Sequence, residues 1–222
     1  MSARTRIAAA VAGGLGLLLV LAQVVLPRLA ASRISSRVGR YGHVDSVSVS
    51  AWPAVKLLWG SADSVTVTAD HLALSTSQAT SLLEEGGHSG DIHLRVATLQ
   101  LGRIRLHDAT LTKSSESLSA AASITDADVA LALPAGVGVS LTGSEEGQVR
   151  VKVGGSLFGL GAAVEALAEP VEGTIVARPQ GLLQAFSLTV FSNPHVYVEG
   201  IGASVESESP LTYRLTLTAS LR

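Results

Sequence analysis

Apolar and polar side chains alternate through most of the chain after residue 40, with the period of two that is typical of half-buried strands. Val47 and Val49 alternate with serines, and Val65 and Val67 alternate with serine and threonines. The same period recurs at Ile92–Val96, Leu99–Leu101, Ile104–Leu106, Val129–Leu133, Val137–Leu141, Val149–Val153, Leu188–Val190, Val196–Val198 and Leu211–Leu217. Turn-forming residues separate these segments, which predicts an antiparallel, meandering sheet.

Helical patterns are few. We expect a helix capped by Ser75 or Thr76 and running toward Glu85, a second helix over Leu157–Leu167, and a short turn over Gln180–Phe186. No linker or charge run divides the chain after residue 40, so we expect one domain there. The predicted fold class is α+β: an N-terminal transmembrane helix followed by a curved, mainly antiparallel β-sheet domain packed with a few helices.

The connection between the first two alternating segments is unusually apolar. It carries Trp52 and Trp59 with a single charge, Lys56, and it is bracketed by Pro53 and Gly60, which suit a helix start and a helix end. Connections are usually polar and lie on the surface, so this one needs a specific reason. Two interpretations stay open: the segment plugs one end of the core, or it is a tip that contacts membrane or lipid.

The first forty residues contain an apolar run, Ile7–Leu26, in which Gln23 is the only strongly polar side chain. Twenty helical residues at about 1.5 Å each cover the roughly 30 Å hydrocarbon layer of a bilayer. An uncleaved anchor is favoured over a cleavable signal peptide, because the run is long and Ala30-Ala31-Ser32 is a poor cleavage site. The expected divisions are a cytoplasmic stub at 1–6, a transmembrane signal-anchor helix at 7–26, a juxtamembrane amphipathic helix at 27–40 and a β-rich domain at 41–222.

Arginines flank the predicted span on both sides. Two precede it and four follow it, a distribution that by itself favours a cytoplasmic C-terminal side. We nevertheless predict an extracytoplasmic domain of a single-pass cell-membrane protein, on the periplasmic or cell-envelope side. The later arginines recur at near-helical spacing opposite Ile34 and Val38, as on the exposed face of an amphipathic helix. An anionic membrane surface is the expected partner of Arg28, Arg33, Arg37 and Arg40.

The charge of the chain is divided unevenly. Residues 1–40 hold six arginines and no acid, whereas residues 41–222 hold ten basic and eighteen acidic side chains. This acidic balance argues against nucleic acid as a partner. The oily strand faces are almost entirely aliphatic, which suits an acyl chain, although an ordinary aliphatic core would give the same pattern. The absence of cysteine excludes disulfides and a lipidated cysteine anchor.

Signals for catalysis and metal binding are poor. The segment 87–90, Gly-His-Ser-Gly, approaches a nucleophile elbow but lacks the glycine two residues after the serine. The histidines show no ligand spacing, and acidic pairs such as Asp126 with Asp128 are expected at turns or strand edges. Glycine pairs lack the continuation of a phosphate-binding loop. We therefore expect a protein that is not an enzyme and needs no metal or cofactor.

The region from Ala30 to Leu74 resembles the LmeA-like phospholipid-binding family of actinobacterial cell-envelope proteins. The resemblance lies in the arginine-spaced helix, the Val-x-Val strand from Val47, the Trp52-Pro53-Ala54-Val55 segment ending in Gly60, and the second Val-x-Val strand from Val65. It implies an extracytoplasmic domain similar to tubular lipid-binding proteins, with a curved sheet that wraps a helix and leaves an apolar groove. One departure is Ala54-Val55, where larger apolar residues are usual.

The predicted function is a membrane-anchored envelope protein that binds phospholipid acyl chains in an apolar groove and supports envelope glycolipid or lipid transport or maturation. The candidate lipid-binding residues are Trp52, Pro53, Val55, Leu58, Trp59, Val65, Val67, Leu131, Leu133 and Phe158. Candidates for a headgroup phosphate are Arg95, Arg103, Arg105 and Lys152, although on alternating strands such residues more often face solvent. The alternative is a non-enzymatic adaptor with a fully packed sheet core and a protein partner.

Overall fold

Two mostly antiparallel β-sheets make up most of the computed structural model, which describes residues 22–85, 89–133, 135–145, 147–157, 160–180 and 187–221. The first sheet contains β1 (Gly42–Ser50), β2 (Ser64–Leu74), β3 (Asp91–Leu101), β4 (Ile104–Lys113), β5 (Ser117–Thr125), β11 (Val196–Glu208) and β12 (Leu211–Leu221). The second sheet contains β6 (Val137–Glu145), β7 (Gln148–Leu157), β8 (Leu160–Val171), β9 (Thr174–Pro179) and β10 (Leu188–Phe191). The fold is therefore mainly β.

The first sheet has the order β1-β2-β3-β4-β5-β12-β11, so the last strand of the chain lies inside it. β2 and β3 are parallel, whereas a meander predicts an antiparallel pair. Between them runs α2 (Thr76–Glu85), because a parallel pair needs a crossover connection. The β3–β4 hairpin turns at Gly102, as the alternation around that glycine predicts.

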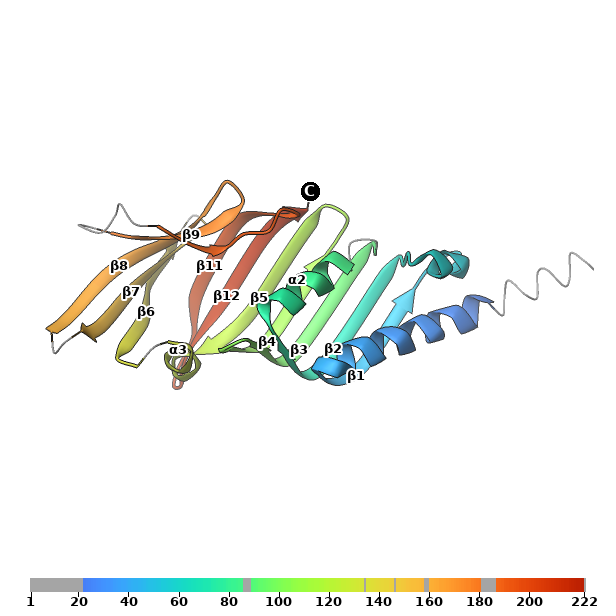
Figure 1. Cartoon of the computed structure of the whole chain (residues 1–222), viewed down its shortest axis with the longest axis horizontal. Helices are drawn as coiled ribbons and strands as arrows, with labels where there is room; N and C mark the ends of the chain where they lie inside the picture. Colours follow the sequence, from blue (N-terminus) through green and yellow to red (C-terminus); the bar gives the residue numbers. More distant parts are fainter. Residues whose placement is uncertain are drawn as a thin grey trace, which may run out of the picture.

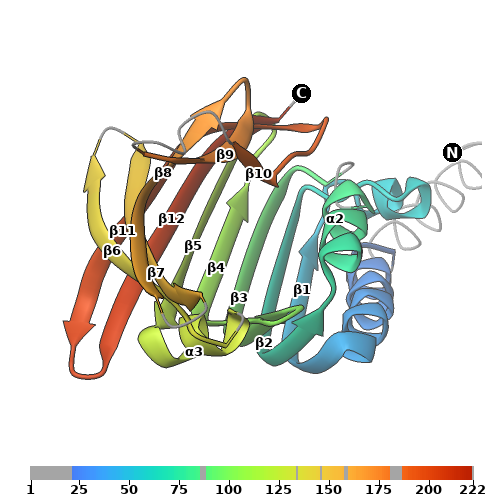
Figure 2. The same ribbon diagram turned by 60° about the vertical axis from the view of Figure 1, so that its left-hand side comes forward.

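The second sheet is an antiparallel meander in the order β10-β9-β8-β7-β6. Three hydrogen bonds join this sheet to the edge strand β11. The backbone N–H of Val198 donates to the carbonyl of Gly173 (3.1 Å), and that of Ile201 donates to the carbonyl of Gly147 (3.0 Å). The N–H of Ala203 donates to Ser144 Oγ (3.0 Å). The two sheets thus lie side by side along the long axis of the molecule (Figures 1 and 2).

An N-terminal helix covers residues 22–38 and is followed by a 3-10 turn, η1 (Gly39–Tyr41). Ala30, Ala31 and Ile34 pack against a cluster of Val49, Val65 and Val67 in β1 and β2. The arginines of this helix are exposed, as its near-helical arginine spacing predicts: Arg28, Arg33 and Arg37. No helix within the described part of the chain is long and apolar enough to cross a membrane. Most of the expected span Ile7–Leu26 lies outside the described residues.

Two further core clusters stabilise the sheets. One contains Leu72 and Val96 and is covered in part by Val38 and Tyr41 from the end of the N-terminal helix and η1. The other joins the sheets, because Ile175 and Phe191 of the second sheet pack against buried side chains of the first. The buried members of that cluster are Leu118, Val196, Val198 and Ala219.

The predicted helix at Ser75 is confirmed. Gln78 N donates to Ser75 Oγ (3.3 Å) and Ser75 N donates to Gln78 Oε1 (2.7 Å), which together form a capping box. A second helix, α3 (Asp126–Ala132), was not predicted, and the strand expected over Val129–Leu133 is wrong. Thr125 caps α3 through a bond from Asp128 N (3.1 Å), and two aspartates in its first turn favour the helix dipole.

The helix expected over Leu157–Leu167 is also wrong. That segment forms the end of β7 and most of β8, paired from Leu157 and Leu160 at the hairpin to Val149 and Ala168. Alanine favours helices in isolation, but pairing with β7 and β9 outweighs that preference here. Strands β5 and β9 were not predicted, since β5 has mostly small side chains and β9 has adjacent apolar residues, Ile175 and Val176, so neither gives clear contrast between faces. The turn expected over 180–186 lies, except for its first residue, outside the described residues.

Candidate functional site

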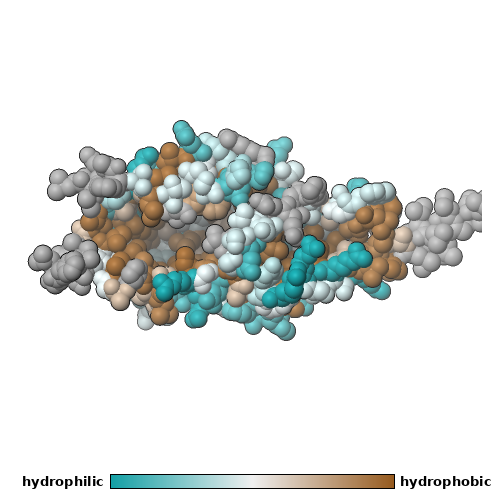
Figure 3. Space-filling model, viewed as in Figure 1, coloured by the Kyte–Doolittle hydropathy of each residue, from teal (hydrophilic) through white to brown (hydrophobic). Residues whose placement is uncertain are grey.

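Exposed apolar side chains gather at the end of the molecule where the N-terminal helix begins. The connection between β1 and β2 forms a six-residue 3-10 helix, η2 (Ala54–Trp59), with Pro53 as its N-cap rather than its first helical residue. Gly60 ends it in a left-handed conformation (φ 76°), which glycine adopts at little cost. Trp52, Leu58 and Trp59 are 72%, 66% and 75% exposed. We call these three residues the tip patch; Figure 3 shows brown surface at this end.

The base of the tip is held firmly although its surface is exposed. Gln23 of the N-terminal helix donates from Nε2 to the carbonyl of Ala51 (3.0 Å) and accepts at Oε1 from Ala54 N (2.8 Å). Ala51 and Ala54 are buried. Gln23, the one polar side chain of the apolar run, therefore fixes the end of that run to the tip.

Lys56, the single cation of the tip, is paired. Its Nζ lies 3.2 Å from Asp63 Oδ1, and the N–H of Trp52 donates to Asp63 Oδ2. The hydrogen bond from Trp52 and then the contact with Lys56 hold the pKa of Asp63 below its usual value. The carboxylate stays ionised at neutral pH, so the tip presents apolar side chains without net charge at its base.

The second sheet has one aliphatic face, here called the acyl face, on which every side chain is half-buried. Its members come from β6, β7 and β8 and lie opposite one another in register: Val137, Val139, Leu141, Val149, Val151, Val153, Val164, Ala166 and Ala168. None of them belongs to a core cluster among the described residues, in contrast to the valines of β1 and β2. The space-filling view is hollowed between this sheet and the first, with brown surface around the hollow (Figure 3).

The opposite face of the second sheet carries its charges. Arg150, Lys152 and Glu165 are exposed, and Arg178 forms an ion pair with Glu169. The alternation therefore places the charged side chains of β7 and β8 on the face opposite the acyl face. A face with this composition can hold an alkyl chain by desolvation, at about 0.8 kcal/mol for each buried methylene.

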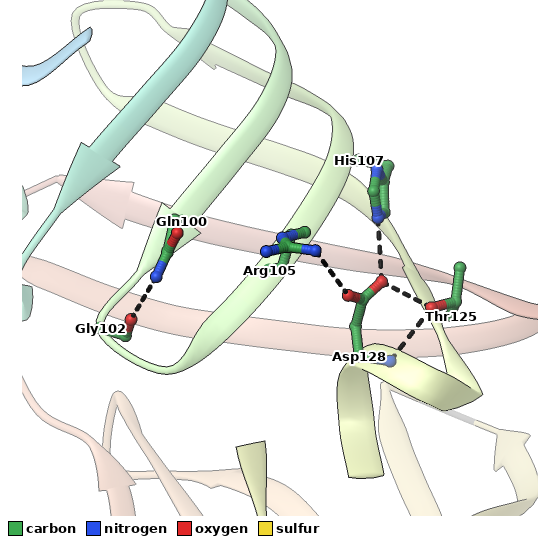
Figure 4. A network of polar contacts seen from close by, with 6 residues as sticks. All are labelled: Gln100, Gly102, Arg105, His107, Thr125 and Asp128. Atoms are coloured by element: carbon green, nitrogen blue, oxygen red, sulfur yellow. Dashed lines mark hydrogen bonds and ion pairs between the residues drawn. The ribbon is translucent and has the colours of Figure 1, made fainter. Parts of the chain in front are cut away.

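A polar network fixes α3 to the first sheet (Figure 4). Asp128 is only 6% exposed, accepts from Thr125 Oγ1, and lies 2.9 Å from His107 Nε2 and 3.8 Å from Arg105 Nη1. Burial favours a higher pKa, but the bonds from Thr125 and His107 and the nearby charges outweigh it, so the pKa of Asp128 is lowered. The expectation that this acid lies at an exposed turn is wrong. Thr125 lies at the start of α3, and Arg105 and His107 lie in β4, so the network holds α3 against the first sheet and its role is structural.

The comparisons with known proteins decide the family. A family model described as LmeA-like phospholipid-binding matches residues 18–218, which is nearly the whole chain. The chain belongs to the LmeA-like phospholipid-binding family. No curated protein and no solved structure gives a match. The LmeA-like proteins form a phospholipid-binding family and not an enzyme family, and the part of the chain that the structure describes holds no cluster of metal-ligating side chains.

The candidate lipid residues of this LmeA-like chain fall into three places. Trp52, Leu58 and Trp59 form the tip patch, with Pro53 exposed and Val55 half-buried beside them. The remaining described candidates lie elsewhere: Val65 and Val67 are buried beneath the N-terminal helix, and Leu131 (72% exposed) and Leu133 lie in and just after α3. Phe158 lies outside the described residues.

The headgroup candidates do not converge on one site. Arg95 lines a surface pocket of about 260 Å³ with Asp45, Asp70 and Asp108, and Lys152 lies on the charged face of β7. Arg103 and Arg105 are exposed in or beside the β3–β4 turn, and Arg105 faces Asp128. Another pocket of about 280 Å³ is lined mostly by polar turn residues. Both volumes are below the roughly 300–1,000 Å³ of ordinary ligand sites.

Sequence reasoning predicted β6 and β7 of the acyl face but placed Val164 and Ala166 of β8 in a helix, and it did not choose this face as a site. The available signal was the strict separation of Val149, Val151 and Val153 from Arg150 and Lys152. That pattern is shared by any strand with one buried face, so it does not show that the face lacks a covering layer.

Proposed function

We propose that this LmeA-like protein is a membrane-anchored protein of the cell envelope that holds phospholipid acyl chains against the acyl face without making or breaking bonds. The single observation that carries the proposal is this half-buried aliphatic face, which lies outside the core clusters of the described residues, in a chain of a phospholipid-binding family. Transport or maturation of envelope lipids is the process that such binding would serve. The anchor is the apolar run Ile7–Leu26, and the body lies on the extracytoplasmic side.

The dimensions of the second sheet fit a lipid tail. β7 has ten residues, which at about 3.3 Å each extend roughly 33 Å. An extended acyl chain is shorter than this, so a tail can lie along the strand over its whole length. Covering even half of a tail's methylenes at about 0.8 kcal/mol each gives useful affinity without a specific polar contact.

The test is to purify the full chain in detergent from a membrane-containing host and to record native mass spectra before and after organic extraction. We expect near-stoichiometric phospholipid that extraction removes. Protein that is always empty, and that also fails to take up added phospholipid, would contradict the proposal. It would favour the adaptor interpretation, in which the acidic surface binds a protein partner.

A matched pair of variants tests the location of the lipid. Val151→Asn places an amide on the acyl face, whereas Lys152→Asn changes the neighbouring residue on the charged face. An amide without a partner beneath a tail costs about 1–3 kcal/mol, and 1.4 kcal/mol is a tenfold change in affinity. We expect about tenfold weaker lipid binding for Val151→Asn and no change for Lys152→Asn. Circular dichroism of both variants checks that the sheet is retained.

A further inference from the structure

The tip patch lies where the apolar N-terminal run enters the described part of the chain. Its three side chains are mostly exposed, and the neighbouring Val24 and Val25 of the N-terminal helix are 49% and 47% exposed. Gln23 holds Ala51 and Ala54 beside it, so the helix start and the tip form one apolar end of the molecule (Figures 1 and 3). An isolated exposed apolar side chain is ordinary, but five together at one end indicate an interaction surface.

We propose that the tip patch lies in the headgroup zone of the bilayer that the apolar run crosses, and that the body stands end-on, with the acyl face held away from that bilayer. The inference rests on the anchor of the proposed function, but not on acyl-chain binding. Tryptophan concentrates in this zone because its ring is apolar and its N–H is polar. The pairing of Lys56 with Asp63 leaves the base of the tip without net charge.

The position of Gln23 sets the posture. Gln23 lies near the end of the run Ile7–Leu26, so a span over this run places Gln23 and the bonded tip at one surface of the membrane. The headgroup zone adds only about 5–7 Å on each side of the hydrocarbon layer. Along the helix axis, at about 1.5 Å per residue, Arg28 lies about 3 Å and Arg33 about 10 Å beyond Leu26, where the run ends. Arg28 therefore reaches the headgroups, and Arg33 does not.

The second sheet lies at the other end of the molecule from the tip (Figure 1). The described N-terminal helix has 17 residues and is about 25 Å long, and it packs against the β1–β3 side of the first sheet, away from the second sheet. The acyl face is consequently beyond reach of the anchoring leaflet. A lipid bound to the acyl face therefore reaches it from the aqueous side of the envelope and not directly from the anchoring leaflet.

The chain contains only two tryptophans, Trp52 and Trp59, so intrinsic fluorescence reports the tip alone. The experiment reconstitutes the full chain in phosphatidylcholine–phosphatidylglycerol vesicles. One set of vesicles contains lipids brominated on the acyl chain, and another contains a dansyl-headgroup lipid that accepts energy from tryptophan. The control variant combines Trp52→Phe and Trp59→Phe with Glu165→Trp, which places one tryptophan at an exposed position of β8.

We expect brominated lipid to quench the native tip several-fold more than the β8 tryptophan, and energy transfer to dansyl lipid to be efficient only from the tip. Efficient transfer from both positions means a body lying flat and would overturn the end-on posture. A native tip quenched only by aqueous iodide would overturn the membrane contact. Chains removed from the vesicles at alkaline pH would refute the anchor itself.

A second measurement separates this inference from acyl-chain binding. Trp52→Ser with Trp59→Ser should retain the phospholipid seen in native mass spectra. Val151→Asn should lose that phospholipid while its tip is still quenched by brominated lipid. Lipid lost with the tip variant would show that the tip belongs to the lipid site and would overturn the separation proposed here.

Discussion

Replacing Gln23 by alanine should release the tip without unfolding the sheets. The variant removes two partly buried hydrogen bonds, of 3.0 Å to the carbonyl of Ala51 and 2.8 Å from Ala54 N. At about 1 kcal/mol each, their loss lowers the free energy of opening the tip by about 2 kcal/mol. Because 1.4 kcal/mol is a tenfold change in an equilibrium, amide exchange at Ala54 should become about 30-fold faster.

Hydrogen–deuterium exchange of the full chain in detergent micelles measures this effect directly. Gln23→Glu is an informative intermediate, because its carboxylate still accepts from Ala54 N but cannot donate to the carbonyl of Ala51. Gln100→Ala is the control, since Gln100 makes one exposed bond of 3.2 Å to the carbonyl of Gly102 in a different turn. Unchanged exchange at Ala54 in Gln23→Ala would refute the assignment of Gln23 as the residue that holds the tip.

Three further predictions concern stability. Gly173→Ala should cost about 2 kcal/mol or more in thermal unfolding, because the backbone is left-handed (φ 79°) and an added Cβ would clash with the ring of Tyr197 in β11. Gly102→Ala (φ 60°), with open space around it, should cost only about 1 kcal/mol. The pKa of Asp128 is lowered in the folded protein, so its ionised form stabilises the fold at pH values above the unfolded pKa of about 3.9. This stabilisation is lost as the pH falls through the folded pKa. Asp128→Asn should therefore make the free energy of unfolding depend less steeply on pH in the acid range. Val67→Ala, in the core, should cost about 2 kcal/mol, whereas Val151→Ala, on the half-buried acyl face, should cost less than about 1 kcal/mol in urea unfolding.

Local signals in the sequence predicted the elements that local interactions stabilise. Ser75 with Gln78 forms the capping box of α2, and Gly102 closes the hairpin between two alternating strands. Gly60 likewise ends η2, as its place after Trp59 predicts. In each case the deciding contacts join residues only a few positions apart, so the sequence pattern carries the information.

The elements that were missed depend on contacts between distant residues. The pattern around Leu131 satisfies both the strand and the helix period, and the bonds of Asp128 to Thr125 and to His107, 21 residues away, accompany the helix. Alternation also does not encode strand direction, so the parallel pairing of β2 with β3 was not predicted. The acyl face could not be recognised as a site because its sequence pattern does not reveal whether another layer covers it.

The position of β12 has a consequence for the biogenesis of the protein. This strand follows the other strands of the sheet in the sequence, yet it pairs with both β5 and β11 and joins them. The five earlier strands of the first sheet therefore have an unfilled edge at β5 until β12 is available for pairing. For a chain exported as proposed, the first sheet cannot be completed until β12 has crossed the membrane.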